Sequence, residues 1–206
     1  MTLPLAPTTT EQHSSVNPWV FPLQQLSVFY GSPLVPRLSH YFLPRLLLHD
    51  ERVLFLDGAN QFDPLLLARF AHKRGRDSSS FNQLVRVARA FTCFQLTELI
   101  ARTPRFLNSF PAKVLVVTAM PDLFFDEDVR ERDARASFGL ALEELKTIAR
   151  GRLAVAVFSD ATSFHTARLG FFHQLTKQAD RLLKVKMRAD DKLAFTCEKE
   201  TPQLSA

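Results

Sequence analysis

Short, unbroken apolar runs alternate along this chain with segments whose apolar residues recur every three to four positions. The runs at residues 26–30, 53–57, 84–88, 113–118 and 153–158 have the length and β-branched content of buried strands. The segments at residues 37–49, 64–73, 94–102 and 132–150 have helical spacing. This alternation is typical of βαβ units, so the sequence predicts an α/β fold with a mostly parallel central sheet flanked by helices.

Proline and glycine residues mark the ends of several predicted helices. Pro64 suits the first turn of a helix, where its missing N–H costs nothing. Pro44 predicts that the helix within residues 37–49 is kinked or short. Gly151 is expected to cap the helix that ends at Arg150.

The two ends of the chain differ from its middle. Residues 181–187 and 192–197 alternate apolar and polar positions around Ala189-Asp190-Asp191, which predicts a C-terminal antiparallel β-hairpin. Residues 1–20 are rich in Pro, Thr and Ser and carry one charged residue, Glu11, so we expect a flexible arm there. Residues 21–206 then form one domain of ordinary size.

Composition excludes several classes of protein. The two cysteines, Cys93 and Cys197, lie far apart and outside any CxxC pattern, so neither a disulfide framework nor a zinc site is expected. No run approaches the ~20 apolar residues that cross a bilayer. The acidic run at residues 122–133 lacks the glycine-containing spacing of a calcium loop, which favours a solvated loop over a metal site. We therefore expect no metal and no membrane contact, and a cytoplasmic location, nuclear if the source is eukaryotic.

The stretch after the first predicted strand has the greatest bearing on function. A phosphate loop reads G-x-x-x-x-G-K-[ST], because its glycines let backbone N–H groups wrap phosphates, its lysine reaches them and its hydroxyl holds magnesium. Residues 31–38 of this chain read GSPLVPRL. Gly31 matches the first glycine, but Pro36, Arg37 and Leu38 occupy the positions of the second glycine, the lysine and the hydroxyl.

Two further motifs are more distinctive. Residues 55–64 read FLDGANQFDP, and residues 87–92 read VARAFT with Gln95 just beyond. They resemble the motifs apolar-apolar-D-T-E-G-x-F-x-P and V-A-R-A-[FY]-x-x-x-x-Q of the archaeal and eukaryotic strand-exchange recombinases of the RecA superfamily. Asp57, Phe62 and Pro64 are in register with the first motif. The resemblance covers residues 26–198 and implies a RecA-like P-loop NTPase core.

The resemblance also implies that the hydrolytic groups are missing. The glutamate that activates water in the family falls at Ala59, which accepts no proton. The Walker B aspartate falls at Thr118, a neutral and weaker metal ligand. The degenerate nucleotide site then comprises Gly31, Pro36, Arg37, Leu38, Ala59 and Thr118. We expect no catalytic residue and no cofactor, with weak ATP binding left open.

Positive charge is concentrated near the C-terminus. Residues 168–192 contain seven Lys or Arg against three Asp, a balance that attracts phosphate backbones. The candidate DNA contacts are Arg168, His173, Lys177, Arg181, Lys184, Lys186 and Arg188. The alternative is a solvated basic hairpin with no ligand. Phe171 and Phe172 fit base stacking in the family's DNA-contacting region, but a place in the core is favoured for them.

The leading hypothesis is a non-catalytic recombinase paralogue that serves as an accessory subunit in homologous recombination or DNA repair. Its expected partners are another RecA-like recombinase or repair protein, and DNA, with single strands preferred. One alternative is a RecA-fold scaffold or regulator unrelated to DNA, because a fold does not determine a function. The other is a divergent ATPase.

Overall fold

Seven strands form one sheet in the computed structural model, which describes residues 17–188, 190 and 192–201. The strands are β1 (Leu26–Tyr30), β2 (Val53–Asp57), β3 (Val85–Arg89), β4 (Val114–Thr118), β5 (Ala154–Phe158), β6 (Arg181–Met187) and β7 (Leu193–Glu200). Their order is β3-β2-β4-β5-β1-β6-β7, and every neighbouring pair is parallel except β6 and β7. This confirms an α/β fold with a mostly parallel sheet and a C-terminal antiparallel hairpin.

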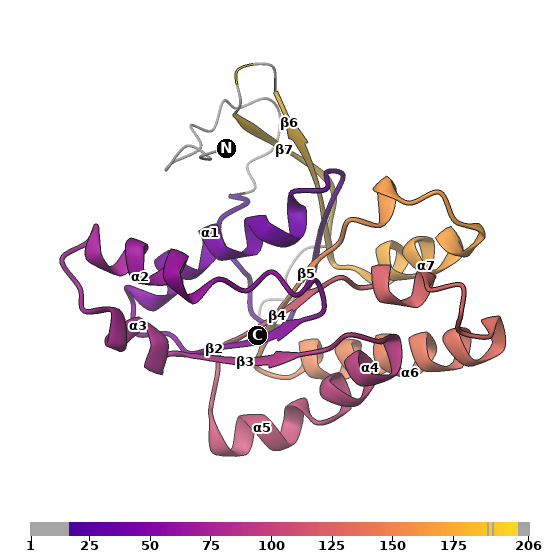
Figure 1. The fold of residues 1–206 in the computed structure, drawn as a ribbon, viewed down its shortest axis with the longest axis horizontal. Coiled ribbons are helices and arrows are strands. Elements are labelled where there is room, and N and C mark those ends of the chain that lie inside the picture. The colour runs from indigo at the N-terminus through magenta and orange to yellow at the C-terminus, as the bar shows by residue number, and fades with distance from the viewer. Residues whose placement is uncertain (1–16, 189, 191, 202–206) are drawn as a thin grey trace.

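Helices cover both faces of the sheet (Figure 1). One face carries α1 (Val35–Leu47), α2 (Pro64–His72) and α3 (Ser78–Gln83), and the other carries α4 (Cys93–Ala101), α5 (Thr103–Ser109), α6 (Glu131–Arg150) and α7 (Gly170–Gln178). Three 3-10 helices, η1 (Asp122–Phe125), η2 (Ala161–Ser163) and η3 (Ala167–Leu169), lie in the loops after β4 and β5.

The central strands are buried on both faces. In β1, Val28 belongs to the core beneath α4, α6 and α7, whereas its neighbour Phe29 belongs to the core beneath α1 to α3. Because successive side chains point to opposite faces, a strand covered on both sides needs apolar residues at every position. This explains why the sequence shows unbroken apolar runs there.

Several elements differ from their predicted form. The first helix begins at Val35, with Pro36 in its first turn, and extends three residues beyond Pro44. Helices α3 and α5 have six and seven residues, which is too short for helical periodicity to be recognised. Gly151 caps α6 as expected, and its N–H donates to the Ile148 carbonyl at 3.1 Å.

The hairpin extends past the end of β1. Strand β6 pairs with β1 only up to the match of Tyr30 with Lys184, and then continues to Met187. The end of β6 therefore projects beyond the carboxyl end of β1, as Figure 1 shows.

Of the arm expected at residues 1–20, residues 1–16 lie outside the described part of the chain. At its end, Trp19 packs against Phe42 and Phe195, with ring centroids 4.7 and 5.3 Å away. Within residues 17–188, 190 and 192–201, no helix is long and apolar enough to cross a membrane.

Candidate functional site at the carboxyl edge of the sheet

The connection from β1 to α1 is a tight turn of four residues. The Ser32 carbonyl accepts the Val35 N–H at 2.9 Å, and the Ser32 hydroxyl oxygen accepts the Leu34 N–H at 3.3 Å. Gly31 has a φ of 107°, and a Cβ at this position would lie 2.9 Å from the Val185 carbonyl oxygen of β6. Glycine is thus required here for packing against the hairpin, and the turn uses two of its backbone donors internally rather than presenting them to a phosphate.

The first turn of α1 offers one outward cation. Pro36 and Leu38 are buried, and the Ser39 hydroxyl donates to the Pro36 carbonyl at 2.6 Å. Arg37 is exposed. Leu38, which was expected at the position of the magnesium-binding hydroxyl, therefore belongs to the core beneath α1.

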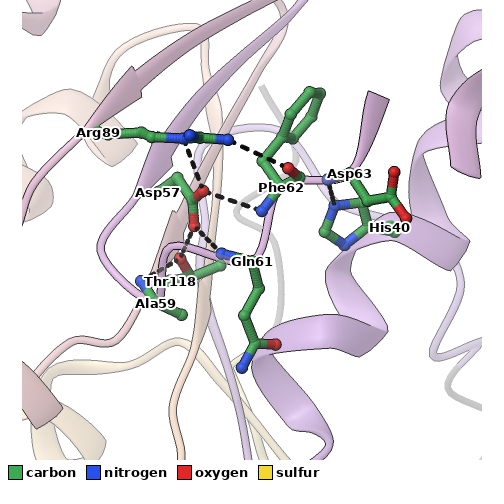
Figure 2. A network of polar contacts seen from close by, with 8 residues as sticks. All are labelled: His40, Asp57, Ala59, Gln61, Phe62, Asp63, Arg89 and Thr118. Atoms are coloured by element: carbon green, nitrogen blue, oxygen red, sulfur yellow. Dashed lines mark hydrogen bonds and ion pairs between the residues drawn. The ribbon is translucent and has the colours of Figure 1, made fainter. Parts of the chain in front are cut away.

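Asp57, at the end of β2, is the centre of a polar network (Figure 2). Its carboxylate is fully buried and accepts the N–H groups of Gln61 at 3.1 Å and Phe62 at 2.9 Å. The Thr118 hydroxyl donates to the same carboxylate at 3.2 Å, and the Arg89 Nε lies 3.5 Å from it. Both oxygens of this carboxylate therefore accept hydrogen bonds that fix the loop after β2.

Thr118 and Arg89 extend this network to the neighbouring strands. The Thr118 oxygen accepts the Ala59 N–H at 3.1 Å, so the structure joins two of the residues expected in the degenerate nucleotide site. Arg89, on β3, also donates to the Phe62 carbonyl at 3.2 Å. The motif residues Asp57, Phe62 and Arg89 thus form the frame of a loop, and neither Ala59 nor Thr118 supplies a carboxylate to it.

His40 joins α1 to the same loop. Its Nδ1 lies 3.1 Å from the Arg37 carbonyl oxygen, which only accepts hydrogen bonds, so the ring proton is on Nδ1. Its Nε2 then accepts the Asp63 N–H at 3.0 Å. Burial lowers the pKa of His40, which favours this neutral form.

A pocket of about 480 Å³ opens at the carboxyl edge, next to the Asp57 network. The residues that line it come from the loops after five strands: Pro36, Ala59, Gln61, Phe91, Ala119, Asp122, Leu123, Phe125, Asp126, Glu127, Asp160, Phe164, His165 and Thr166. We call this the carboxyl-edge pocket. Four of its described lining residues are carboxylic acids, and His165 is the one basic residue among them.

Two of these acids, Asp122 and Asp160, are joined by a hydrogen bond. The Ser159 hydroxyl donates to Asp122 Oδ1 at 2.7 Å, and the Asp160 N–H donates to Asp122 Oδ2 at 2.8 Å. Burial raises the pKa of Asp122 to about 6. The Asp160 Oδ1 atom is itself buried and accepts no hydrogen bond from the residues that the structure describes. Neither Asp122 nor Asp160 forms an ion pair with a lysine or arginine in the part of the chain that the structure describes.

This arrangement is unsuited to a polyphosphate. Phosphate sites present backbone N–H groups and cations, whereas this pocket presents carboxylates. No group of three or more His, Cys, Asp or Glu among the described residues has an arrangement that would hold a metal ion.

Of the seven basic residues predicted to contact DNA, three form side-chain hydrogen bonds or ion pairs within the protein. Arg181 is 1% exposed and donates to the carbonyls of Val20 at 2.8 Å and Asn17 at 3.2 Å. Arg168 donates to the carbonyls of Phe124, Asp126 and Val129, which fixes the loop before α6. Lys184 Nζ lies 3.6 Å from a carboxylate oxygen of Glu198. The expectation that Arg181 is available to DNA is therefore wrong, because its guanidinium is buried against the end of the arm.

The other four basic residues remain exposed. His173 and Lys177 lie on α7, while Lys186 lies near the end of β6 and Arg188 directly follows this strand. Lys177 lies near the start of β6, because its carbonyl accepts from Lys199 Nζ at 2.9 Å and Lys199 pairs with Leu182 of β6. Phe171 and Phe172 are 3% and 7% exposed and belong to the core, as favoured from the sequence.

The sequence reasoning missed Phe91, Phe164 and Asp160 as members of one site. Each follows the carboxyl end of a predicted strand, and this common position was the signal that could have grouped them. No protein-family model matches the chain, and no curated protein matches it.

Proposed function

We propose that this protein is a non-catalytic paralogue of the RecA-like recombinases that serves as an accessory subunit in homologous recombination or DNA repair. The motifs around Asp57 and Arg89 support the link to these recombinases, and the mostly parallel sheet is compatible with it. The residues at the hydrolytic positions support the absence of catalysis, because Leu38 is buried and Ala59 and Thr118 carry no charge.

The observation that carries a partner role is the open edge of β3, with exposed apolar side chains on the strand and just after it. Strand β3 ends the strand order, so its outer edge pairs with no other strand in the described part of the chain. Val87 on this strand is 37% exposed, and Phe91 and Phe94 just after it are 62% and 50% exposed. We call Val87, Phe91 and Phe94 the β3 surface. An open strand edge beside exposed aromatic rings suits the addition of an extended segment from another protein.

The partner role is tested by affinity purification from the native host. A Phe91→Ser/Phe94→Ser double variant removes most of the β3 surface, while Leu140→Ser removes an apolar side chain, 68% exposed, from α6. We expect a RecA-like recombinase or a repair protein to co-purify with the wild type and with Leu140→Ser, but not with the double variant. Recovery of no such protein, or its undiminished recovery with the double variant, would contradict the proposal.

The DNA link is tested by binding to single-stranded oligonucleotides at several salt concentrations. Each lost phosphate contact reduces the salt dependence by a slope of roughly 0.7 on a double-logarithmic plot. A Lys186→Ala/Arg188→Ala variant is therefore expected to bind more weakly and with a shallower slope. No binding at low salt would favour a scaffold or regulator unrelated to DNA.

The absence of ATP hydrolysis is tested by adding ATP and magnesium to the purified protein. We expect no turnover, because no carboxylate stands at Ala59 or Thr118. Turnover that Arg37→Ala abolishes would establish the divergent ATPase instead.

A further inference from the structure

The carboxyl-edge pocket has an excess of negative charge that nothing in its described lining neutralises. Asp126 and Glu127 are exposed at the pocket, and Asp160 carries a buried oxygen that accepts no hydrogen bond from any described residue. Arg168 keeps its positive charge, but its guanidinium is held by three backbone carbonyl groups of the loop before α6, and it does not line the pocket. A cation that enters the pocket would meet several carboxylates and no lysine or arginine among the described lining residues.

The pocket also has an aromatic wall. Phe164 is 43% exposed and its ring packs edge-on against Phe125, with centroids 5.6 Å apart. Phe91, which is 62% exposed, lines the pocket as well. Aromatic faces attract cations and also cover the carbon stem of an amine or guanidinium compound. An inorganic metal ion has no carbon stem for this wall to cover.

We propose that the carboxyl-edge pocket binds an organic cation, a protonated amine or a guanidinium group carried on an apolar stem. Asp126, Glu127 and Asp160 balance its charge, and the rings of Phe91 and Phe164 cover its stem. The volume of about 480 Å³ falls within the range of small-molecule sites, roughly 300–1,000 Å³. This inference is independent of the proposed role in recombination.

Two sources carry this chemistry, namely a free amine in the cell and the arginine side chain of a bound protein. Agmatine represents the first, since it has a guanidinium and a free ammonium group. N-acetyl-arginine-amide represents the second, since its backbone is capped as in a protein chain. Tighter binding of agmatine would indicate a free amine, and tighter binding of the capped arginine would indicate a protein side chain.

The experiment titrates both compounds into the full chain at about 0.15 M salt, where long-range charge effects are screened. Binding is followed by calorimetry and by shifts of backbone amide NMR signals. We expect saturable binding that shifts the amides of the pocket. ATP, as the anionic probe, is expected not to compete.

An Asp126→Asn/Glu127→Gln variant keeps the shape of two exposed side chains and removes their charge. It is expected to weaken agmatine binding about tenfold, because each exposed carboxylate contributes a factor of several. The control Asp50→Asn/Glu143→Gln makes the same change in net charge at exposed positions outside the pocket, and it should bind like the wild type. Phe164→Ala should also weaken binding, since it shortens the aromatic wall.

Three results would overturn the proposal. The first is that neither compound binds at millimolar concentration. The second is that the pocket variant and the control variant bind equally well, which would place the cation elsewhere. The third is that ATP displaces agmatine from the pocket, which would show that the site prefers anions.

Discussion

Replacing Asp57 with alanine removes the acceptor around which the loop after β2 is built. The buried carboxylate receives two backbone N–H groups and one hydroxyl, and alanine would leave all three without this acceptor. A hydrogen bond to a charged group contributes about 1.5–3 kcal/mol, but neighbouring bonds are not additive and the loop relaxes. We therefore expect the free energy of unfolding to fall by about 3–5 kcal/mol, the usual cost of breaking a buried charged network.

Arg89→Ala provides the contrast within the same network. Its side chain is 47% exposed, and its Nε lies 3.5 Å from the carboxylate, so solvent screens the pair. Asp57 would retain its three hydrogen-bond donors, and we expect a loss of only about 1 kcal/mol. Asp128→Ala, which removes an exposed carboxylate outside the network, should change stability by less than about 0.5 kcal/mol.

The assay is equilibrium unfolding in urea, followed by circular dichroism and by the fluorescence of Trp19, the single tryptophan. Agreement between the two probes would justify a two-state treatment. A loss below about 1 kcal/mol for Asp57→Ala would refute the reasoning. So would equal losses for the Asp57 and Arg89 variants, because the buried hydrogen bonds would then not be the main contribution.

Two further predictions concern a glycine and a histidine. Gly31→Ala should destabilise the protein by about 1–3 kcal/mol, since the φ of Gly31 is positive and the new Cβ would press on the Val185 carbonyl. In contrast, the Cβ of Gly139→Ala in α6 would meet nothing within 4 Å, and this substitution should stabilise the protein by up to about 1 kcal/mol. Both are measured by urea unfolding, and similar effects of the two substitutions would contradict the packing argument. Burial lowers the pKa of His40 in the folded protein below the value of about 6.5 that it has in the unfolded chain. The neutral ring therefore stabilises the fold at a pH above about 6.5, and this contribution is lost as the pH falls through the lower pKa of the folded protein. The stability advantage of the wild type over His40→Gln should therefore shrink between pH 7.5 and pH 5, and a constant difference would mean that the bond from the Asp63 N–H does not depend on the neutral ring.

Local signals were sufficient for most of the secondary structure. The strands β1 and β2 coincide with their predicted ranges, because an apolar run bounded by turn residues is visible in a few consecutive positions. The short helices α3 and α5 were missed for the converse reason, since six or seven residues contain fewer than two full helical turns.

The candidate site was less predictable than the fold. The hypothesis of a degenerate phosphate loop came from residues 31–38 alone, since Pro36, Arg37 and Leu38 differ in chemistry from the residues of a phosphate loop. The tight turn that Gly31 allows was not, because it depends on the approach of β6 from more than 150 positions away along the chain. The likeness to recombinases stays a prediction.

The sequence by itself determined the α/β class, the parallel core and the terminal hairpin, because strand and helix periods are properties of neighbouring residues. Only the tertiary structure decided which charges are available. Arg181 looks like any other cation in the basic segment, yet it is buried, while Asp126 and Asp160 come from separate loops and share one pocket. The physical reason is that burial and electrostatic environment depend on the strand order, which brings distant loops to the same edge of the sheet.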